Sequence, residues 1–218
     1  MKTATKILLE KLIRLTILLA IVGVVPGSAQ AYFSTIDTAE VIAPDQYQIS
    51  LEPQLILNRY DGANAVMRFD TGLNESSGIR GILGFGKVDF ELGGMYKYVP
   101  FPDLEKQPAI GFEAGAILAR VNGGTEFSLR FHPLISKRFA TEVGDLIPYA
   151  SLPIGITSRP DQTVVPIQIA GGTEFRPLNY KNWSFFGELG INLNQSFSYL
   201  SVAAAWRFND SALSGFKK

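Results

Sequence analysis

The chain of 218 residues carries 20 basic and 20 acidic side chains and no cysteine. Without cysteine it can form neither disulfide bonds nor thiolate metal sites. The balanced charge excludes the basic face on which nucleic-acid recognition depends, so we expect no nucleic-acid partner.

The first 31 residues have the layout of a secretory signal peptide. A leader with four basic residues is followed by an apolar run at 15–25, and Ala29-Gln30-Ala31 then fits a small-x-small cleavage site. The run is too short for a comfortable transmembrane helix of roughly 20 residues, although an uncleaved N-terminal anchor is the alternative. We predict export with cleavage after Ala31, which leaves a mature chain with 16 basic and 19 acidic residues.

Almost every later segment alternates apolar and polar residues, as half-exposed strands do. In the stretch "YQISLEPQLIL", for example, Tyr47, Ile49 and Leu51 share one face, whereas Gln48 and Ser50 share the other. The pattern predicts about ten strands, with 8–12 possible. Their expected ranges are 46–58, 63–73, 76–86, 87–98, 108–120, 124–138, 145–157, 163–176, 182–192 and 197–208.

The length of these strands and their two faces favour a membrane barrel over a soluble sandwich. Most exceed the roughly 5–6 residues of a strand in a soluble protein and reach the roughly 9–11 residues that a tilted strand needs to cross a bilayer. One face is apolar, and the other carries small residues with charges of both signs. The charged residues predicted to face the barrel interior are Glu52, Arg68, Arg80, Glu91, Glu113, Glu126, Arg130, Glu174, Glu188 and Arg207.

Aromatic residues concentrate at one end of the predicted strands. An even strand count places both ends of the barrel chain on the periplasmic side, so odd strands begin there and even strands end there. An aromatic girdle is then expected at that interface. Its predicted members are Tyr47, Tyr96, Tyr98, Phe175, Trp183 and Trp206.

The last strand, "LSVAAAWRF", alternates apolar residues up to a terminal aromatic. With this strand the chain resembles the small outer-membrane β-barrel proteins of Gram-negative bacteria over residues 46–208. The resemblance implies a transmembrane barrel inserted by the barrel assembly machinery, in contact with outer-membrane lipid and lipopolysaccharide. The residues that resemble the assembly signal are Leu200, Val202, Ala204, Trp206 and Phe208.

The chain departs from that family's pattern at its C-terminus and within several strands. Ten residues follow the terminal aromatic, and prolines interrupt several predicted strands, most of all in "LIPYASLPIGI" at 146–156. Proline removes a hydrogen-bond donor from the ladder. We divide the chain into a signal peptide at 1–31, an N-terminal periplasmic segment at 32–45, an all-β antiparallel transmembrane barrel at 46–208 and a C-terminal tail at 209–218.

The sequence predicts a structural or narrow-pore, porin-like role in the outer membrane. A narrow pore would favour cations, because interior acids outnumber bases. We expect no enzyme, cofactor or metal site. One alternative is a lipid-modifying enzyme that uses the single histidine, His132, but Ser128 and Ser136 lie roughly 13 Å away along the strand. The other alternative is a soluble exported β-sandwich.

Overall fold

The computed structural model describes residues 34–58, 62–121, 123–160 and 162–209. The predicted signal peptide lies outside the described residues, as does the predicted tail beyond its first residue. Within the described ranges, no helix is long and apolar enough to cross a membrane. The strands are β1 (Gln46–Ile56), β2 (Gly62–Asn74), β3 (Ser77–Gly86), β4 (Phe90–Phe101), β5 (Ala109–Val121), β6 (Gly124–Ser136), β7 (Phe139–Thr141), β8 (Gly144–Ser151), β9 (Ile154–Ser158), β10 (Thr163–Val164), β11 (Ile167–Pro177), β12 (Trp183–Asn194) and β13 (Tyr199–Asn209).

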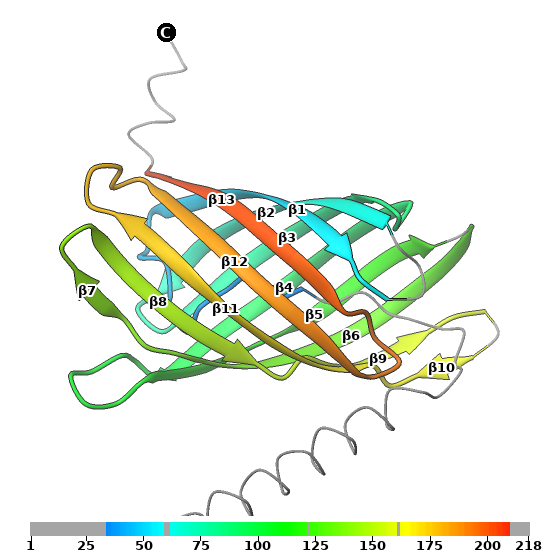
Figure 1. Ribbon diagram of the computed structural model, residues 1–218. Coiled ribbons are helices and arrows are strands. Elements are labelled where there is room, and N and C mark those ends of the chain that lie inside the picture. Colours follow the sequence, from blue (N-terminus) through cyan, green and yellow to red (C-terminus); the bar gives the residue numbers. More distant parts are fainter. Residues whose placement is uncertain (1–33, 59–61, 122, 161, 210–218) are drawn as a thin grey trace, which may run out of the picture.

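Ten of these strands close into an antiparallel barrel (Figure 1). The ring runs from β1 to β6 in chain order and continues through β8, β11, β12 and β13, and β13 pairs with β1 from Gln46↔Asn209 to Ile56↔Tyr199. The prediction of a single antiparallel barrel of about ten strands is confirmed. We call the end at which Gln46 pairs with Asn209 the mouth, and the opposite end the far end.

The wall of the barrel is broken where prolines interrupt two predicted strands. The strand predicted at 145–157 is divided into β8 and β9 by Leu152 and Pro153, and β9 continues the line of β8 between β6 and β11. The strand predicted at 163–176 is also divided: β10 pairs with β9, and β11 begins after Pro166. The two predicted ranges are thus divided at Pro153 and at Pro166, which are among the prolines that the sequence places within predicted strands, since proline has no N–H group to donate to the ladder.

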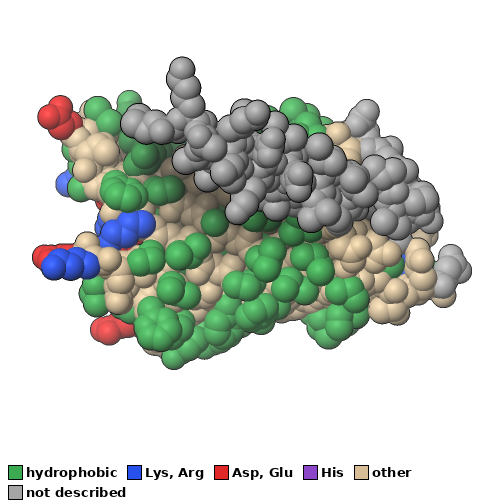
Figure 2. Space-filling view, turned by 60° about the horizontal axis from the view of Figure 1, so that its bottom comes forward, with side chains coloured by type: hydrophobic (Ala, Val, Ile, Leu, Met, Phe, Trp, Pro, Cys, Tyr) green, Lys and Arg blue, Asp and Glu red, His purple; other side chains and the backbone are tan. Residues whose placement is uncertain are grey.

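The two faces of the wall have the polarity opposite to that of a soluble protein. Outward side chains are large and apolar, such as Leu51 (60% exposed), Leu189 (45%) and Val202 (54%). Inward side chains are polar, and Glu52 and Ser201 are each 1% exposed. Figure 2 shows hydrophobic side chains spread over the wall and charged side chains gathered at one end. A sheet closed in this way has no second sheet to pack against, which rules out the β-sandwich alternative.

The lumen is filled by side chains and by a part of the chain that precedes β1. Residues 34–40, which we call the inner segment, lie inside the barrel; Ser34 through Ala39 are buried there. This part of the segment predicted at 32–45 is therefore placed in the lumen rather than in the periplasm. Toward the far end, an apolar cluster fills the lumen with Ile56, Val66, Ile82, Val88, Met95, Ile117, Ala119 and Phe197.

Candidate functional site

The charged residues predicted for the interior all point into the lumen. Nine of them are buried, and Arg207 is partly buried near the mouth. Arg68 pairs with Glu52 on the adjacent strand. The other pairs each reach past one strand inside the lumen: Arg80–Glu113 (3.4 Å), Arg130–Glu91 (3.5 Å) and Arg207–Glu174 (3.1 Å). Glu126 pairs with Arg159 (2.8 Å). Such pairing is the condition under which buried charges are tolerated.

Glu188 has a different set of partners, because its carboxylate holds the inner segment. The backbone N–H groups of Thr35 and Ile36 donate to it over 2.9 Å and 2.7 Å. The hydroxyls of Tyr149 (2.8 Å) and Tyr199 also donate to it. One buried carboxylate from β12 thus joins the inner segment to β8 and β13.

Two glycines make room for the tyrosines that contact Glu188. Gly190 pairs with Tyr199, and a Cβ atom at Gly190 would lie 2.1 Å from the tyrosine ring. Gly172 pairs with Tyr149, and a Cβ atom there would lie 2.6 Å from that ring. Each tyrosine therefore lies flat across its neighbouring strand and reaches Glu188, which is a close approach that only glycine permits.

Ile36 fixes the depth of the inner segment in the lumen. Its side chain is 2% exposed and packs in an apolar cluster with Tyr149, Phe186, Ala203 and Ala205. This small cluster lies beside the hydrogen bonds to Glu188. The segment is thus held by apolar packing and by backbone hydrogen bonds at the same place.

Asp37 forms the first acidic anchor of the inner segment. Its carboxylate lies 2.5 Å from the Lys97 ammonium and 3.3 Å from the Arg80 guanidinium. Arg80 also donates to the backbone carbonyl of Thr35 (3.0 Å), and Lys97 donates to the carbonyl of Glu40 (2.8 Å). The two bases thus bind both the side chain and the backbone of the segment.

Glu40 forms the second acidic anchor, at the mouth. It pairs with Arg138 (2.8 Å) and Arg176 (2.7 Å), and Arg176 also pairs with Glu174 (2.6 Å). Burial alone would raise the pKa of Glu40. The hydrogen bond from Arg138 and the charges of Arg176 and Arg138 nevertheless hold its pKa below the usual glutamate value.

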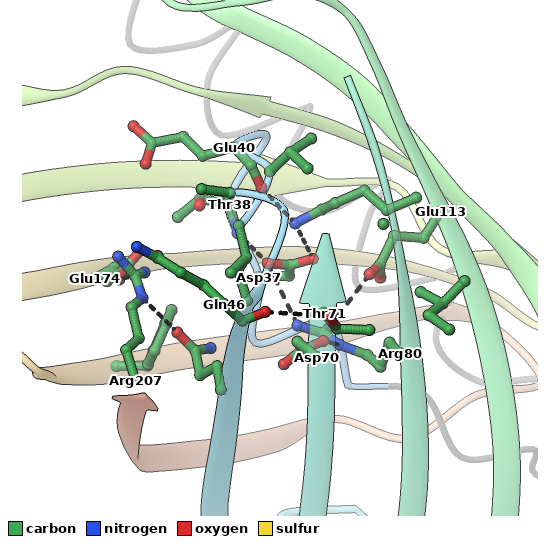
Figure 3. A pocket seen from close by; sticks show the side chains of 18 of the residues that line it. Asp37, Thr38, Glu40, Gln46, Asp70, Thr71, Arg80, Glu113, Glu174 and Arg207 are labelled. Atoms are coloured by element: carbon green, nitrogen blue, oxygen red, sulfur yellow. Dashed lines mark hydrogen bonds and ion pairs between the residues drawn. The ribbon is translucent and has the colours of Figure 1, made fainter. Parts of the chain in front are cut away.

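A cavity of about 230 Å³ lies between the two anchors at the mouth (Figure 3). Five acidic and five basic residues line it, so the two kinds are equal in number. The acids are Asp37, Glu40, Asp70, Glu113 and Glu174, and the bases are Arg80, Lys97, Arg138, Arg176 and Arg207. Two of the five acids belong to the inner segment.

Sequence reasoning missed the inner segment and several of its partners. Asp37, Glu40, Arg138 and Arg176 were not among the predicted site residues. Asp37 and Glu40 precede the first predicted strand, so alternation does not place them. Arg138 and Arg176 end the predicted strands 124–138 and 163–176 in the inward register, which was the signal available for them. Among the described residues, no group of three or more His, Cys, Asp or Glu side chains is arranged to hold a metal ion.

His132 lies inside the lumen, 2% exposed, with Nδ1 3.7 Å from Glu113 Oε2. The Ser128 hydroxyl, four residues away on β6, is hydrogen-bonded to the hydroxyl of Thr157 (2.8 Å). The histidine thus faces a carboxylate on β5 rather than the outer surface of the wall.

The aromatic residues predicted for the girdle lie near the mouth. Tyr47 stacks on Phe208, which stacks on Trp206 with ring centroids 4.9 Å apart, and Trp206 pairs with Trp183. Tyr96 (44% exposed) and Tyr98 (37%) face outward on β4, and Phe175 pairs with Phe185 at the mouth end of β11. In β13, the predicted assembly-signal residues Leu200, Val202 and Trp206 are exposed, and Ala204 and Phe208 are half-buried.

No family model and no curated protein matches the chain. Solved structures similar to it include the beta domain of the Bordetella autotransporter Brka (13% identity, 77% of this chain and 100% of that one, TM-score 0.49). An outer membrane channel from Pseudomonas putida F1 is also similar (9% identity, 85% and 100%, TM-score 0.47), as is Ail, the attachment invasion locus protein of Yersinia pestis (12% identity, 76% and 99%, TM-score 0.27). The closed ring of ten strands, with large apolar side chains outward and polar side chains inward, is the fold of an outer-membrane β-barrel.

Proposed function

We propose that the protein is an integral outer-membrane β-barrel, exported by a cleaved signal peptide, that is closed at rest and has a structural role. The observation that carries this proposal is the inverted polarity of the wall around a filled lumen. Large apolar side chains cover the outside, where a charge near the middle of the bilayer would cost roughly 2–4 kcal/mol. Outer-membrane lipid and lipopolysaccharide are the surroundings that suit this surface.

The filled lumen favours the structural role over the porin-like one. The inner segment occupies the lumen from the mouth, and the apolar cluster around Ile82, Met95 and Ile117 occupies it toward the far end. Water and ions need a continuous polar path, and a ten-stranded barrel is close to the size at which side chains fill the interior. Steady conduction would therefore require the inner segment to leave.

The lipid-modifying alternative is not supported by the position of His132. Its ring faces the lumen beside Glu113, whereas lipid substrates lie against the outside of the wall. The hydroxyl of Ser128 is engaged by Thr157. A nucleophile and its base should lie within hydrogen-bond reach of each other, and this pair of residues does not provide that geometry.

Cell fractionation and gel migration test the membrane assignment. We expect the protein in outer-membrane pellets, with different migration before and after boiling, because folded barrels resist denaturation by detergent. Recovery in the periplasmic supernatant with identical migration would overturn the proposal. For the closed state, we expect no steady conductance of the wild-type protein in planar bilayers, and sustained open channels would favour the porin-like role instead.

A further inference from the structure

We propose that the mouth of the barrel is a binding site for an extended acidic peptide, and that the inner segment occupies this site as a displaceable ligand within the same chain. The inference rests on the proposed closed barrel and adds the class of ligand that its mouth would bind. It follows from how the segment is held, from the charges that remain when it is removed, and from the opening beside it.

The wall contacts the inner segment as a receptor contacts a bound peptide. Residues 34–40 belong to none of the strands, so no β-ladder ties them to the wall. Side chains of the wall bind the segment's backbone instead. The donors or acceptors on the wall are Glu188 for the N–H groups of Thr35 and Ile36, Ser136 for the N–H of Ala39 (3.0 Å), Arg80 for the carbonyl of Thr35 and Lys97 for the carbonyl of Glu40.

The charge of the mouth cavity selects for an acidic ligand. With the segment in place, five acids balance five bases. Without Asp37 and Glu40 the same cavity would keep all five bases and only three acids, Asp70, Glu113 and Glu174. A vacated mouth is therefore net positive and attracts carboxylates through the field of its bases. This local surplus is opposite in sign to the cation preference that the total count of interior acids suggested.

The two acidic anchors are spaced three residues apart and bind separate pairs of bases. Asp37 reaches the buried Arg80 and Lys97. Glu40 reaches Arg176 and Arg138, and the side chain of Arg138 is 46% exposed. Solvent and a competing carboxylate can therefore reach the outer anchor first, so displacement of the segment begins at Glu40.

A groove beside the outer anchor supplies the path of entry. Its lining joins Ala39, Glu40 and Val41 to Glu75 and Ser76 before β3, to the end of β4 and the connection that follows it, and to residues 137–140. Its volume, about 930 Å³, is larger than that of the mouth cavity. A peptide can thus approach the segment at the mouth, where both ends of the barrel chain lie and which the even strand count predicts to be periplasmic.

Thiol labelling of the full-length protein tests whether the segment is displaceable. The natural chain has no cysteine, so Ala39→Cys introduces a single thiol. Residue 39 belongs to the inner segment and is 1% exposed, so the thiol is buried while the segment is in the lumen. We expect slow labelling by a water-soluble maleimide, and labelling about tenfold faster or more when Asp37→Asn and Glu40→Gln are added, because both anchors lose their charge-assisted bonds.

Two controls separate release of the segment from loss of charge and from loosening of the barrel. Glu142→Gln removes an exposed acid at the turn between β7 and β8, outside the mouth cavity and the groove, and should leave the labelling rate at position 39 unchanged. Ala119→Cys, buried in the cluster toward the far end, should stay protected in both backgrounds. Equal labelling at position 39 in all backgrounds, or parallel exposure at position 119, would overturn displacement of the segment.

Peptide binding tests the specificity of the site. The probe is a fluorescent synthetic peptide with the sequence FSTIDTAEV, added to the full-length Asp37→Asn, Glu40→Gln protein. We expect it to bind, and the same peptide with Asn and Gln in place of its acids to bind at least about tenfold more weakly. Equal binding of the two peptides, or of neither, would overturn the proposal.

Heat-modifiable migration is measured on every variant, so that failure of the barrel is told apart from failure of the segment site. If the double variant does not fold, Glu40→Gln alone provides both measurements. Glu40 lies at the mouth, where its partner Arg138 is half-exposed, so its replacement disturbs the buried part of the lumen least. A wild-type protein that never migrates as a folded barrel would contradict the proposed function. A folded barrel in which Glu40→Gln changes neither labelling nor peptide binding would contradict the segment site only.

Discussion

At the scale of single residues, Glu188 accepts four hydrogen bonds, whereas the sequence predicted only that it faces the lumen. The donors to its carboxylate are two backbone N–H groups of the inner segment and the hydroxyls of Tyr149 and Tyr199. Buried hydrogen bonds to a charged acceptor are stronger than neutral ones. The same residue therefore contributes to the stability of the wall and to the position of the segment.

Replacement of Glu188 by leucine should lower the free energy of unfolding by about 2–4 kcal/mol, because four buried donors lose their acceptor. Tyr199→Phe removes one donor and should cost only about 0.5–1.5 kcal/mol. The measurement is urea unfolding of the protein folded in lipid vesicles. An equal cost for the two substitutions would argue against the central position of Glu188.

The contribution of Glu40 to stability should depend on pH. Its pKa is lowered in the folded protein, where Arg138 and Arg176 favour the carboxylate. The stabilisation is therefore fully present above the usual value of 4.5 and is lost as the pH falls through the lower, folded pKa.

The difference in unfolding free energy between the wild type and Glu40→Gln measures this effect. We expect the difference to be constant from about pH 7 to about pH 5 and to shrink in more acidic solution. A difference that stays constant down to about pH 3, or that grows, would show that the ion pairs of Glu40 do not stabilise the protein.

At the scale of elements, the sequence predicted the pair β1 and β13, which closes the ring, better than the strand that is divided into β8 and β9. The alternation of β13 is regular, and it pairs with β1 in a single register from Gln46↔Asn209 to Ile56↔Tyr199. The predicted strand at 145–157 contains prolines and is interrupted at Leu152 and Pro153, although the N–H of Leu152 still donates to the carbonyl of Pro133 (3.4 Å) and the carbonyl of Pro153 still accepts from Gln168 (3.0 Å). The ring closes nonetheless, because β9 resumes contact with β6 beyond the break.

The terminal aromatics of β13 test the predicted assembly signal. Trp206 and Phe208 stack on each other and face the outside near the mouth. We expect Phe208→Ala to reduce the folded, heat-modifiable fraction in cells several-fold, but to leave folding into vesicles without assembly machinery largely intact. Tyr96→Ala, an outward aromatic away from the last strand, should not reduce the fraction in cells. Equal defects in cells and in vesicles would indicate a packing role instead.

At the scale of the whole molecule, the apolar outer surface of the wall suits the interior of a membrane rather than bulk water. Leu189 lies halfway along β12, 45% exposed, among outward apolar side chains. Leu178, in the turn after β11, is 54% exposed near the mouth. The two positions differ in depth, so a membrane would distinguish them and bulk water would not.

Leu189→Arg should lower the free energy of unfolding in vesicles by about 2–4 kcal/mol, because it places a charge near the middle of the bilayer. Leu178→Arg should cost at most about 1 kcal/mol, since it lies near the interface. Both values come from urea titrations of the vesicle-inserted protein. Similar, small costs at the two positions would contradict the membrane orientation.

The sequence by itself determined the class of fold, the approximate strand ranges and which side chains face the lumen. These follow from alternation with a period of two, which is local information. For the same reason, residues such as Glu91 and Arg130 could be placed on the inner face before any contact between them was known.

Only the tertiary structure decided what fills the barrel. The inner segment carries no strand periodicity, and its contacts join residues as far apart as Ile36 and Glu188. Ring closure brings these residues together, and no local pattern encodes such a distance. The balance of five acids and five bases at the mouth likewise exists only once the segment has entered the lumen.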